Sequence, residues 1–250
     1  MRVLVIGDSC EDVFIYGEIE RMSPEAPVPI LQPIRKTKNG GMALNVYNNF
    51  LSLGVEVDII TNEKSQIRKI RYVDNRSSQM VLRIDENDKC EEIDEITRMH
   101  ICNNQYQDKT YDAIVISDYC KGFLSKTDIE LLCKSNKNVF VDTKKQLGKW
   151  IQHATFIKIN SFEYKKNYDY FNTKDFTDKL IVTLGGEGCR YNGRDFSVKE
   201  VPVKDVSGAG DTFLAGLVYG YLDTNSIYEA IKFAQECTTI VVQKHGVSTV

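Results

Sequence analysis

The stretch from Lys204 to Leu217, K-D-V-S-G-A-G-D-T-F-L-A-G-L, holds residue types that suit the transfer of a charged group. Two aspartates, Asp205 and Asp211, flank a turn of small residues from Ser207 to Gly210. Apolar residues at helical spacing follow at once, so the turn leads into a helix N-terminus, whose free N–H groups attract anions. Asp211, in the first helical turn, is then placed to act as a base. A capping aspartate is the common explanation of a bare G-x-G-D, so other segments must decide.

Six further polar or glycine-rich stretches have the same relation to a predicted strand, because each lies where a strand ends. They are Asp8–Asp12, Gly40–Asn45, Ser117–Lys121, Asp142–Lys144, Asn160–Glu163 and Thr183–Gly188. In open α/β sheets, ligands bind at the carboxyl ends of the strands. Seven stretches in register with the strand ends therefore predict one composite site along a single sheet edge.

Two of these stretches have a second explanation that the sequence leaves open. Asn160 and Glu163 lie one helical turn apart, which suits a hydrated Mg²⁺ ion, but an N-cap with a carboxylate in the first turn explains them equally well. The T-L-G-G-E-G segment from Thr183 to Gly188 offers N–H groups and a hydroxyl to phosphates. By itself, such a segment is often only a tight turn between strands.

Short apolar runs alternate with helical patterns along the rest of the chain. Predicted strands are Val3–Ile6, Val55–Thr61, Ala113–Ser117, Val139–Val141, Phe156–Ile159 and Leu180–Leu184. Predicted helices are Met42–Leu53, opened by Gly40-Gly41, then Glu91–Tyr106, Lys126–Ser135, Lys144–Ile151, Ser161–Asn167, Ala209–Leu222 and Ser226–Lys244. This alternation predicts an α/β fold with a doubly wound, mostly parallel sheet flanked by helices.

Other segments do not fit that rhythm. Phe14–Ile19 and Val28–Arg35 have the pattern of exposed or edge strands, and Ile67–Val73 and Met80–Ile84 form a predicted hairpin. We expect them to build a small β-sheet lid, approximately residues 12–36 and 67–85, that covers the site. Later in the chain, Cys189–Tyr191 and Phe196–Val201 predict an outer hairpin around the turn at residues 192–195.

Composition excludes several classes of protein. The 250 residues are 42% hydrophobic, enough for one core, so we expect a single domain over residues 1–250. A net charge of −3 gives no reason to expect nucleic acid or a membrane as partner. A first strand at Val3 leaves no room for a signal peptide and no apolar run is long enough to span a membrane, so we expect a cytoplasmic protein.

Known catalytic motifs of other classes are missing. The seven cysteines include no C-x-x-C pair, which argues against structural zinc or a disulfide framework. The chain also lacks the P-loop motif, a G-x-G-x-x-G after the first strand and the G-x-S-x-G elbow of hydrolases.

Four motifs in the right order resemble those of the ribokinase-like (PfkB) carbohydrate kinases. They are Gly40-Gly41 with Asn45, then N-S-F-E, T-L-G-G-E-G and D-V-S-G-A-G-D-T-F. Within that family the N-terminal third, with S-P-E-A-P-V-P and S-D-Y-C-K-G, is most similar to the kinase domain of heptose 7-phosphate kinase/ADP-heptose synthases. The resemblance implies a ribokinase-like fold. It also implies transfer of the γ-phosphoryl group of ATP, with Mg²⁺, to a hydroxyl of a phosphorylated sugar, here the anomeric hydroxyl of heptose 7-phosphate.

The resemblance also implies roles for individual residues. Asp211 would be the base for the acceptor hydroxyl, and the N–H groups of Gly208, Ala209 and Gly210 would form an anion hole. Asn160 and Glu163 would organise Mg²⁺ through water and, with Thr183, Gly185 and Gly188, lie along the nucleotide. Sugar hydroxyls would be held by Asp12, Gly40, Gly41 and Asn45. Candidates for a substrate phosphate are Arg83, Lys121 and Lys144, for which a surface cation is the alternative. Asp205, Ser207, Gly246 and Ser248 resemble positions around a monovalent-cation (K⁺) loop of some members.

The chain departs from the family pattern in three places. The segment from Asn62 to Ile67 is short, Gln235 stands where related kinases often have asparagine, and the chain stops at Val250 without a nucleotidyltransferase domain. We therefore expect no ADP-heptose synthesis. A kinase of another sugar or of a nucleoside, and a catalytically idle paralogue that binds nucleotide or sugar, stay open as alternatives. Edge strands in the lid lead us to expect a homodimer formed through it.

Overall fold

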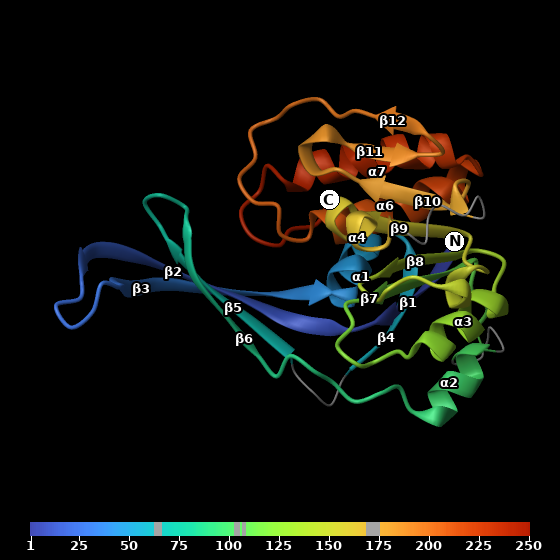
Figure 1. Ribbon diagram of the computed structural model, residues 1–250, viewed down its shortest axis with the longest axis horizontal. Helices are drawn as coiled ribbons and strands as arrows, with labels where there is room; N and C mark the ends of the chain where they lie inside the picture. Colours follow the sequence, from blue (N-terminus) through green and yellow to red (C-terminus); the bar gives the residue numbers. More distant parts are fainter. Residues whose placement is uncertain (63–66, 103–105, 107–108, 169–175) are drawn as a thin grey trace.

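The protein is described by a computed structural model that covers residues 1–62, 67–102, 106, 109–168 and 176–250 (Figure 1). Its main sheet is parallel from β4 to β10 and ends in an antiparallel hairpin. In spatial order the strands are β12 (Arg194–Phe196), β11 (Cys189–Tyr191), β10 (Leu180–Thr183), β9 (Phe156–Asn160), β8 (Val139–Thr143), β7 (Ala113–Asp118), β1 (Arg2–Gly7) and β4 (Glu56–Thr61). The predicted doubly wound, mostly parallel sheet is thus confirmed.

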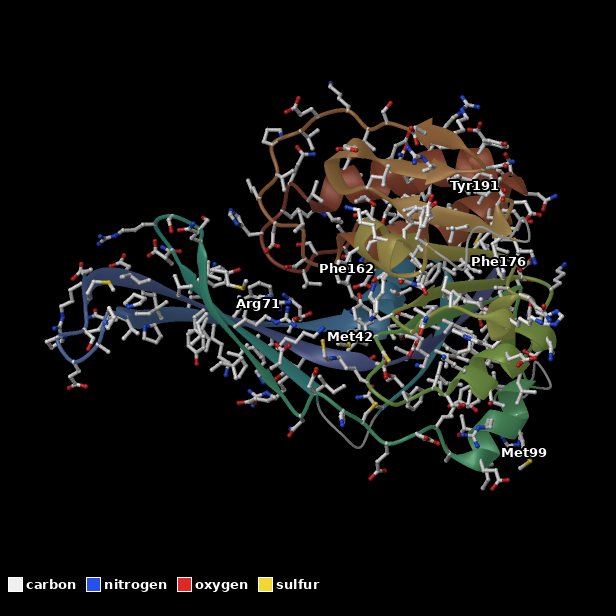
Figure 2. All side chains as sticks on the ribbon, viewed as in Figure 1. Met42, Arg71, Met99, Phe162, Phe176 and Tyr191 are labelled. Carbon is white, nitrogen blue, oxygen red and sulfur yellow. The ribbon has the colours of Figure 1, made fainter. Side chains whose placement is uncertain are left out.

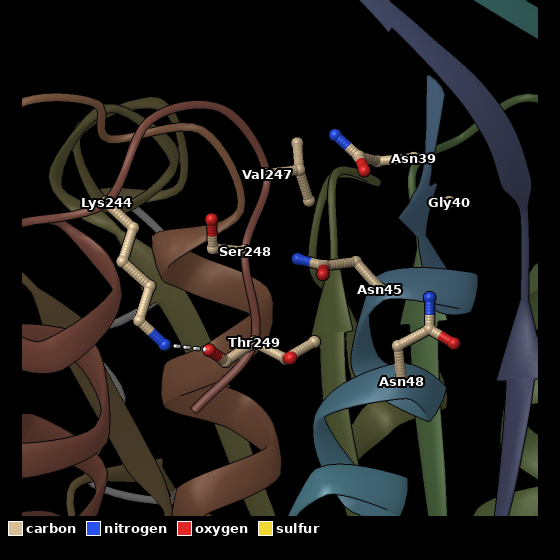
Figure 3. A pocket seen from close by; sticks show the side chains of 8 residues that line it. All are labelled: Asn39, Gly40, Asn45, Asn48, Lys244, Val247, Ser248 and Thr249. Carbon is tan, nitrogen blue, oxygen red and sulfur yellow. Dashed lines mark hydrogen bonds between the residues drawn. The ribbon is translucent and has the colours of Figure 1, made fainter. Parts of the chain in front are cut away.

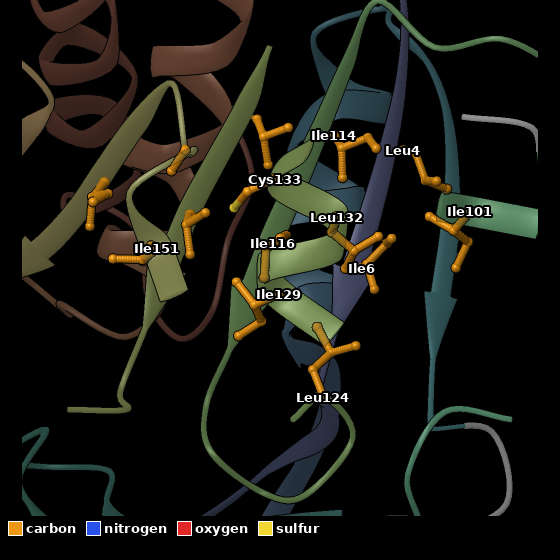
Figure 4. Close-up of a cluster of buried hydrophobic side chains, with 14 of the residues drawn as sticks. Leu4, Ile6, Ile101, Ile114, Ile116, Leu124, Ile129, Leu132, Cys133 and Ile151 are labelled. Carbon is orange, nitrogen blue, oxygen red and sulfur yellow. The ribbon is translucent and has the colours of Figure 1, made fainter. Parts of the chain in front are cut away.

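Alternating side chains of β1 supply both faces of this sheet. Val3 and Val5 pack on one face in a cluster with residues of α1, α6 and α7, whereas Leu4 and Ile6 pack on the other with residues of α2 and α3 (Figure 4). The helices are α1 (Ala43–Ser52), α2 (Glu95–Cys102), α3 (Lys126–Ser135), α4 (Ser161–Lys166), α6 (Ala209–Thr224) and α7 (Ile227–Val241). A strand that is apolar on both faces must be covered by helices on both sides, which is the layering seen here.

A second sheet projects from the core as a long twisted ribbon (Figure 1). Its order is β3 (Pro29–Met42), β2 (Ser9–Met22), β5 (Ile67–Asp74) and β6 (Met80–Glu86). The expected lid is present, but β2 is an inner strand rather than an edge, and β2 and β3 extend to the core. Pairing of β2 with β5 stops at Gly17, and beyond it β2 pairs with β3 alone. The register of β2 and β3 also shifts after Tyr16 and again after Ile19.

Three predicted elements are shorter than expected. The helix predicted over Glu91–Tyr106 is Glu95–Cys102, with 103–105 outside the described residues. The helix predicted over Lys144–Ile151 is only the 3₁₀ turn η1 (Lys149–Ile151), because Lys144 N donates to the Asp118 carbonyl and stays tied to the strand end. The hairpin predicted to restart at Phe196 already pairs at Arg194, since Asn192 and Gly193 alone make the turn, both with positive φ.

None of the helices in the described part of the chain has the length and apolarity that crossing a membrane requires.

Candidate active site

Asp211 lies in the first turn of α6, with only 3% of its surface exposed. Each carboxylate oxygen accepts one hydrogen bond: Oδ1 from the Tyr119 hydroxyl at 2.7 Å and Oδ2 from Asn45 Nδ2 at 3.1 Å. Burial raises the pKa of Asp211 to about 6, although the Tyr119 and Asn45 hydrogen bonds pull it down. A carboxylate with a pKa near neutrality is suited to accept a proton from a hydroxyl.

The turn before Asp211 needs a glycine at residue 208. Gly208 has φ +81°, and a Cβ there would lie 2.5 Å from Asn45 Nδ2. That same amide donates to the Gly208 carbonyl at 3.3 Å as well as to Asp211. Asn45, to which the family resemblance gives a role at the sugar hydroxyls, thus reaches the predicted base directly and joins α1 to the turn.

Lys158 of β9 lies next to this turn and was missed by the sequence reasoning. Its side chain is buried, pairs with Asp142 Oδ2 at 2.6 Å, and would lie 2.9 Å from a Cβ at Gly210. Burial favours the neutral form of Asp142, but Lys158 and Lys144 hold the pKa of this carboxyl below its usual value. The available signal was a lysine inside the otherwise apolar strand F-I-K-I-N.

A cleft of about 970 Å³ gathers most of the residues predicted for phosphates and nucleotide. The glycine turn and Lys158 line it, together with five valines, three threonines and the charged residues Lys199 and Glu200. The predicted residues among its lining are Lys144, Asn160, Thr183, Gly185, Gly188, Gly208, Ala209 and Gly210. Gln235 also lines this cleft and donates to the Phe196 carbonyl at 2.6 Å.

Asn160 and Glu163 form a complete capping box at the start of α4. Glu163 N donates to Asn160 Oδ1, and Asn160 N donates back to Glu163 Oε2, at 2.9 and 2.8 Å. Glu163 Oε1 also meets Lys144 Nζ at 2.5 Å. Among the described residues, no cluster of three or more His, Cys, Asp or Glu side chains is arranged to hold a metal ion. The orphaned, buried Oδ1 of Asp142 lies 3.5 Å from the same ammonium, so oxygen ligands for a hydrated Mg²⁺ are nevertheless close at hand.

The predicted sugar-binding residues lie where the lid joins the core. Gly40 and Gly41 are the last residues of β3 before Met42, rather than the opening of a helix. A Cβ at Gly41 would lie 2.1 Å from Asp12 Oδ2, so this glycine makes room for the carboxylate. Asp12 is 5% exposed and forms an ion pair with Arg71.

Arg71 and Arg83 face the same hollow from neighbouring lid strands. The register places Phe14 beside Arg71 and Arg71 beside Arg83, and the Arg71 guanidinium lies 5.0 Å from the Phe14 ring centre. Figure 2 marks the position of Arg71 on the lid. Like charges directly opposite each other destabilise a sheet. Their carboxylate partners are Asp12 for Arg71 and Asp85, at 2.7 Å, for Arg83.

A hollow of about 560 Å³ surrounds these arginines and extends to the loop before the glycine turn. Its charged and titratable lining residues include Arg35, Arg71, Asp74, Arg83, Lys204, Asp205 and His245. Of the three cations predicted for a substrate phosphate, only Arg83 faces it. Lys121 Nζ pairs with Asp88 at 2.6 Å, and Lys144 lines the larger cleft.

The residues predicted for a monovalent-cation loop do come together. Asp205 accepts from Ser207 N at 2.8 Å and from Gly246 N at 3.1 Å. The Ser248 hydroxyl donates to the carbonyls of His245 and Gly246. Ser248 also lines a hollow of about 370 Å³ behind Asn45, which Figure 3 shows between α1 and the C-terminal segment.

Asp8 and Tyr119 are further site residues that sequence reasoning did not single out. Asp8 is fully buried and accepts hydrogen bonds from the backbone N–H groups of Tyr119, Lys121 and Phe123. It thereby fixes the loop after β7, from which Tyr119 reaches Asp211. Both residues belong to stretches that the strand pattern placed at the sheet edge, but neither type of contact is readable from spacing.

Comparison with family models and with curated proteins gives matches over most of the chain. A family model described as pfkB family carbohydrate kinase matches residues 59–250. The bifunctional protein HldE of a Nitratiruptor species is 32% identical over an alignment of 293 residues, which covers 99% of this chain and 63% of that protein. The chain spans about 63% of the length of the curated HldE relatives it matches.

Solved structures share the fold. Ribokinase from Thermotoga maritima superposes with a TM-score of 0.69 at 16% identity, covering 98% of this chain and 94% of that one. Phosphofructokinase-2 from Escherichia coli, in complex with potassium, gives a TM-score of 0.71 at 12% identity, with coverages of 99% and 94%. A family match over more than half of the chain, on a ribokinase-like fold, identifies the chain as a member of the pfkB family of carbohydrate kinases, enzymes that transfer a phosphoryl group to an alcohol.

Proposed function

We propose that this protein transfers the γ-phosphoryl group of ATP to the anomeric hydroxyl of a phosphorylated sugar, heptose 7-phosphate. The observation that carries the proposal is the position of Asp211. It is buried, its pKa is near neutral, and it directly follows the glycine turn that lines the large cleft. The similarity to HldE proteins supports the choice of heptose.

In the proposed reaction, Asp211 takes the proton of the acceptor hydroxyl while that oxygen forms a bond to the γ-phosphorus. The bond between the γ-phosphorus and the β,γ-bridging oxygen breaks, and ADP leaves with that oxygen. We propose that the N–H groups of Gly208 to Gly210 and the Lys158 ammonium, which lies beside this turn, stabilise charge on the transferring group. Each such donor typically contributes about 10²–10³ in rate.

Asn160, Glu163 and Lys144 are proposed to lie along the phosphates of the nucleotide. Mg²⁺, when bound through water near Asn160 and Glu163, would neutralise phosphate charge. Five valines that line this cleft, Val198, Val201, Val203, Val206 and Val242, suit the apolar faces of the adenine ring.

A phosphate on the acceptor is supported by Arg71 and Arg83. Paired guanidinium groups recognise phosphate by bidentate hydrogen bonds. Arg71 lies two residues farther along β5 than Lys69, which is opposite Asp12 in the register of β2 and β5. The backbone row that carries these arginines is about 7 Å beyond the row of Asp12, at roughly 3.3 Å per residue, and the Arg71 guanidinium reaches back to the Asp12 carboxylate. The phosphate of a phosphorylated sugar would have guanidinium groups to bind beside the carboxylate proposed to hold its hydroxyls, whereas a nucleoside would bring no phosphate to them.

A coupled assay of ADP release, with MgATP and a panel of sugars and sugar phosphates, tests the proposal. We expect turnover with heptose 7-phosphate and at least tenfold lower kcat/KM with the same heptose lacking phosphate. Turnover of a free sugar or nucleoside instead would identify the alternative acceptor class. Nucleotide binding by calorimetry beside zero turnover on every acceptor would identify an idle binding protein.

Arg83→Gln should raise the KM for the phosphorylated acceptor about tenfold or more, as expected for loss of a charged hydrogen bond. Arg68→Gln is the matched control. Arg68 also lies on β5 and forms ion pairs with Glu11 and Glu86, but its position in the strand puts it on the opposite face of the sheet from Arg71. An equal rise in KM for both variants would argue against an arginine-lined phosphate site.

We also propose a homodimer formed through the lid, in a cytoplasmic enzyme. Large apolar side chains lie exposed on the ribbon, and β3 and β6 are its edges. A monomeric mass by light scattering would refute the dimer.

The proposal of K⁺ near Asp205 is checked separately by comparing activity in potassium and sodium salts.

A further inference from the structure

Asp211, the predicted base, accepts a hydrogen bond from the phenol of Tyr119. The Tyr119 hydroxyl donates to Asp211 Oδ1 at 2.7 Å, while Asn45 serves the other oxygen. Tyr119 follows β7, whereas Asp211 lies on α6, so the contact joins two separate elements. A hydrogen bond to a carboxylate favours its charged form and fixes its orientation.

We propose that Tyr119 is a positioning residue for Asp211, whose hydroxyl keeps the carboxylate ionised and aimed so that the acceptor hydroxyl meets a free lone pair. This inference rests on the proposed role of Asp211 as base. Tyr119 donates a hydrogen bond throughout and does not give up its proton. Since Oδ1 and Oδ2 each hold one donor, each keeps one acceptor position for a substrate.

Three contacts besides the one with Asp211 hold Tyr119 in place, one to its backbone and two to its ring. Its backbone N–H donates to the fully buried Asp8 at 2.7 Å. The ammonium groups of Lys69, from the lid, and Lys144, from the nucleotide cleft, each lie 5.1 Å from the centre of its ring. Cation–π contacts of this kind contribute more when they are shielded from water, and Lys69 is 8% exposed. The hydroxyl is therefore fixed in place where acceptor, nucleotide and base meet.

The other charged and titratable groups around Asp211 act through space. Lys158, from β9, lowers its pKa and Asp142, from β8, raises it. Lys144 and the Cys10 thiol of β2 also interact with it electrostatically. Burial and the Asp211 carboxylate raise the pKa of Tyr119 well above its usual value, so the phenol stays protonated across the working range. Tyr119 can thus hold Asp211 at any pH at which the base itself titrates.

The test is the pH profile of kcat/KM for the acceptor in wild type and Tyr119→Phe. The variant keeps the ring and its lysine contacts but loses the hydroxyl. We expect the acid limb to move up by about one pH unit, the shift that loss of one charged hydrogen bond gives. The loss of kcat/KM is then about fivefold at pH 6 and under about twofold at pH 9.

Tyr111→Phe is the matched control. Tyr111 precedes the same strand at its other end, and its hydroxyl donates to the carboxylate Asp58 at 3.0 Å, away from the site. The control should leave the acid limb where it is in wild type. Coincident limbs for wild type and Tyr119→Phe would overturn the proposal, as would equal shifts in the two variants.

A measurement that needs no turnover distinguishes the proposed role of Tyr119 from the proposed phosphoryl transfer. The pKa of the Asp211 carboxyl, taken by NMR from ¹³C-aspartate spectra of the protein and its Asp211→Asn variant, should rise in Tyr119→Phe. Replacing Tyr119 by 3-fluorotyrosine, a stronger donor, should lower it instead while preserving the fold. An unchanged pKa in both variants rejects the role of Tyr119, whereas full activity in Asp211→Asn rejects the base.

Discussion

Lys158 and Gly210 approach so closely that a Cβ on residue 210 would lie 2.9 Å from Lys158 Nζ. A buried ammonium therefore lies against the backbone of the very turn that is proposed to receive the transferring phosphoryl group. Asp142 neutralises it at 2.6 Å, so the charge is tolerated in the core and still directed at the cleft.

Lys158→Met should lower kcat by about 10²–10³, the usual loss for one donor to a developing oxyanion. It should also destabilise the fold by about 3–5 kcal/mol, because Asp142 loses its ion pair at 2.6 Å and keeps only the Lys144 ammonium at 3.5 Å. Enzyme assays and urea unfolding measure the two effects separately.

The double variant Lys158→Met with Asp142→Asn removes both charges. We expect most of the stability to return while activity stays low. Recovery of activity together with stability would show that Lys158 acts only through folding.

Asp211→Asn should abolish phosphoryl transfer, a loss of about 10²–10⁴, while the unfolding free energy rises. Since the folded pKa of about 6 lies above the ordinary 3.8, folding opposes ionisation of this carboxyl. The fold is therefore most favoured with Asp211 protonated, and it loses stability as pH rises from about 4 to 6, by up to about 3 kcal/mol.

The stability difference between Asp211→Asn and wild type should accordingly be small near pH 4 and reach its full size above pH 6. Urea unfolding across that range measures it. A gain that does not change with pH would mean that the asparagine packs better and that titration of Asp211 is not the cause. A matched carboxylate control is Asp112→Asn at the far end of β7, which should leave activity intact.

Gly208→Ala should reduce kcat at least tenfold, because its Cβ displaces the Asn45 amide that holds Asp211. Gly193→Ala is the matched control: Gly193 also has positive φ, +72°, but nothing lies within 4 Å of a Cβ there. Both variants should lose about 1–2 kcal/mol of stability from the left-handed backbone. Equal kinetic effects would exclude the Asn45 contact as the reason for glycine at 208.

Asn160→Ala separates the capping role of Asn160 from a role at the nucleotide. Ser125 and Asp128 form the same capping box at α3, away from the cleft, so Ser125→Ala is its control. Each variant should lose about 1 kcal/mol in thermal or urea unfolding. Only Asn160→Ala should raise the KM for MgATP; if both leave it unchanged, residue 160 is an N-cap and nothing more.

Much of the fold could be predicted because short apolar runs set the strands and their carboxyl ends set the site edge. Asp211 and the turn from Gly208 to Gly210 were predictable for the same reason: the chemistry is contiguous in sequence. The bounds of β2 and β3 were not, because charged and polar residues stand on both faces of these strands and no apolar alternation marks where they begin and end.

The missing site residues depend on contacts between distant segments. Lys158 could be recognised only once β8 brought Asp142 beside it. The row of Arg71 and Arg83 requires the register of two lid strands, which a one-residue slip would abolish. Tyr119 meets Asp211 across a separation of 92 positions. The shortened segment after Thr61 includes 63–66, which lie outside the described residues.

The pairing of β2 with β5 ends at Gly17, which divides the lid into a four-stranded part and a two-stranded tip. The four-stranded part carries Asp12, Arg71 and Arg83. In the tip beyond it, β2 pairs with β3 alone, so none of these three residues lies in a strand pair of the tip. Changes in the tip leave the spacing of those three side chains intact. Substitutions in the tip can therefore change the surface that the end of the lid presents without moving the residues proposed to bind the acceptor.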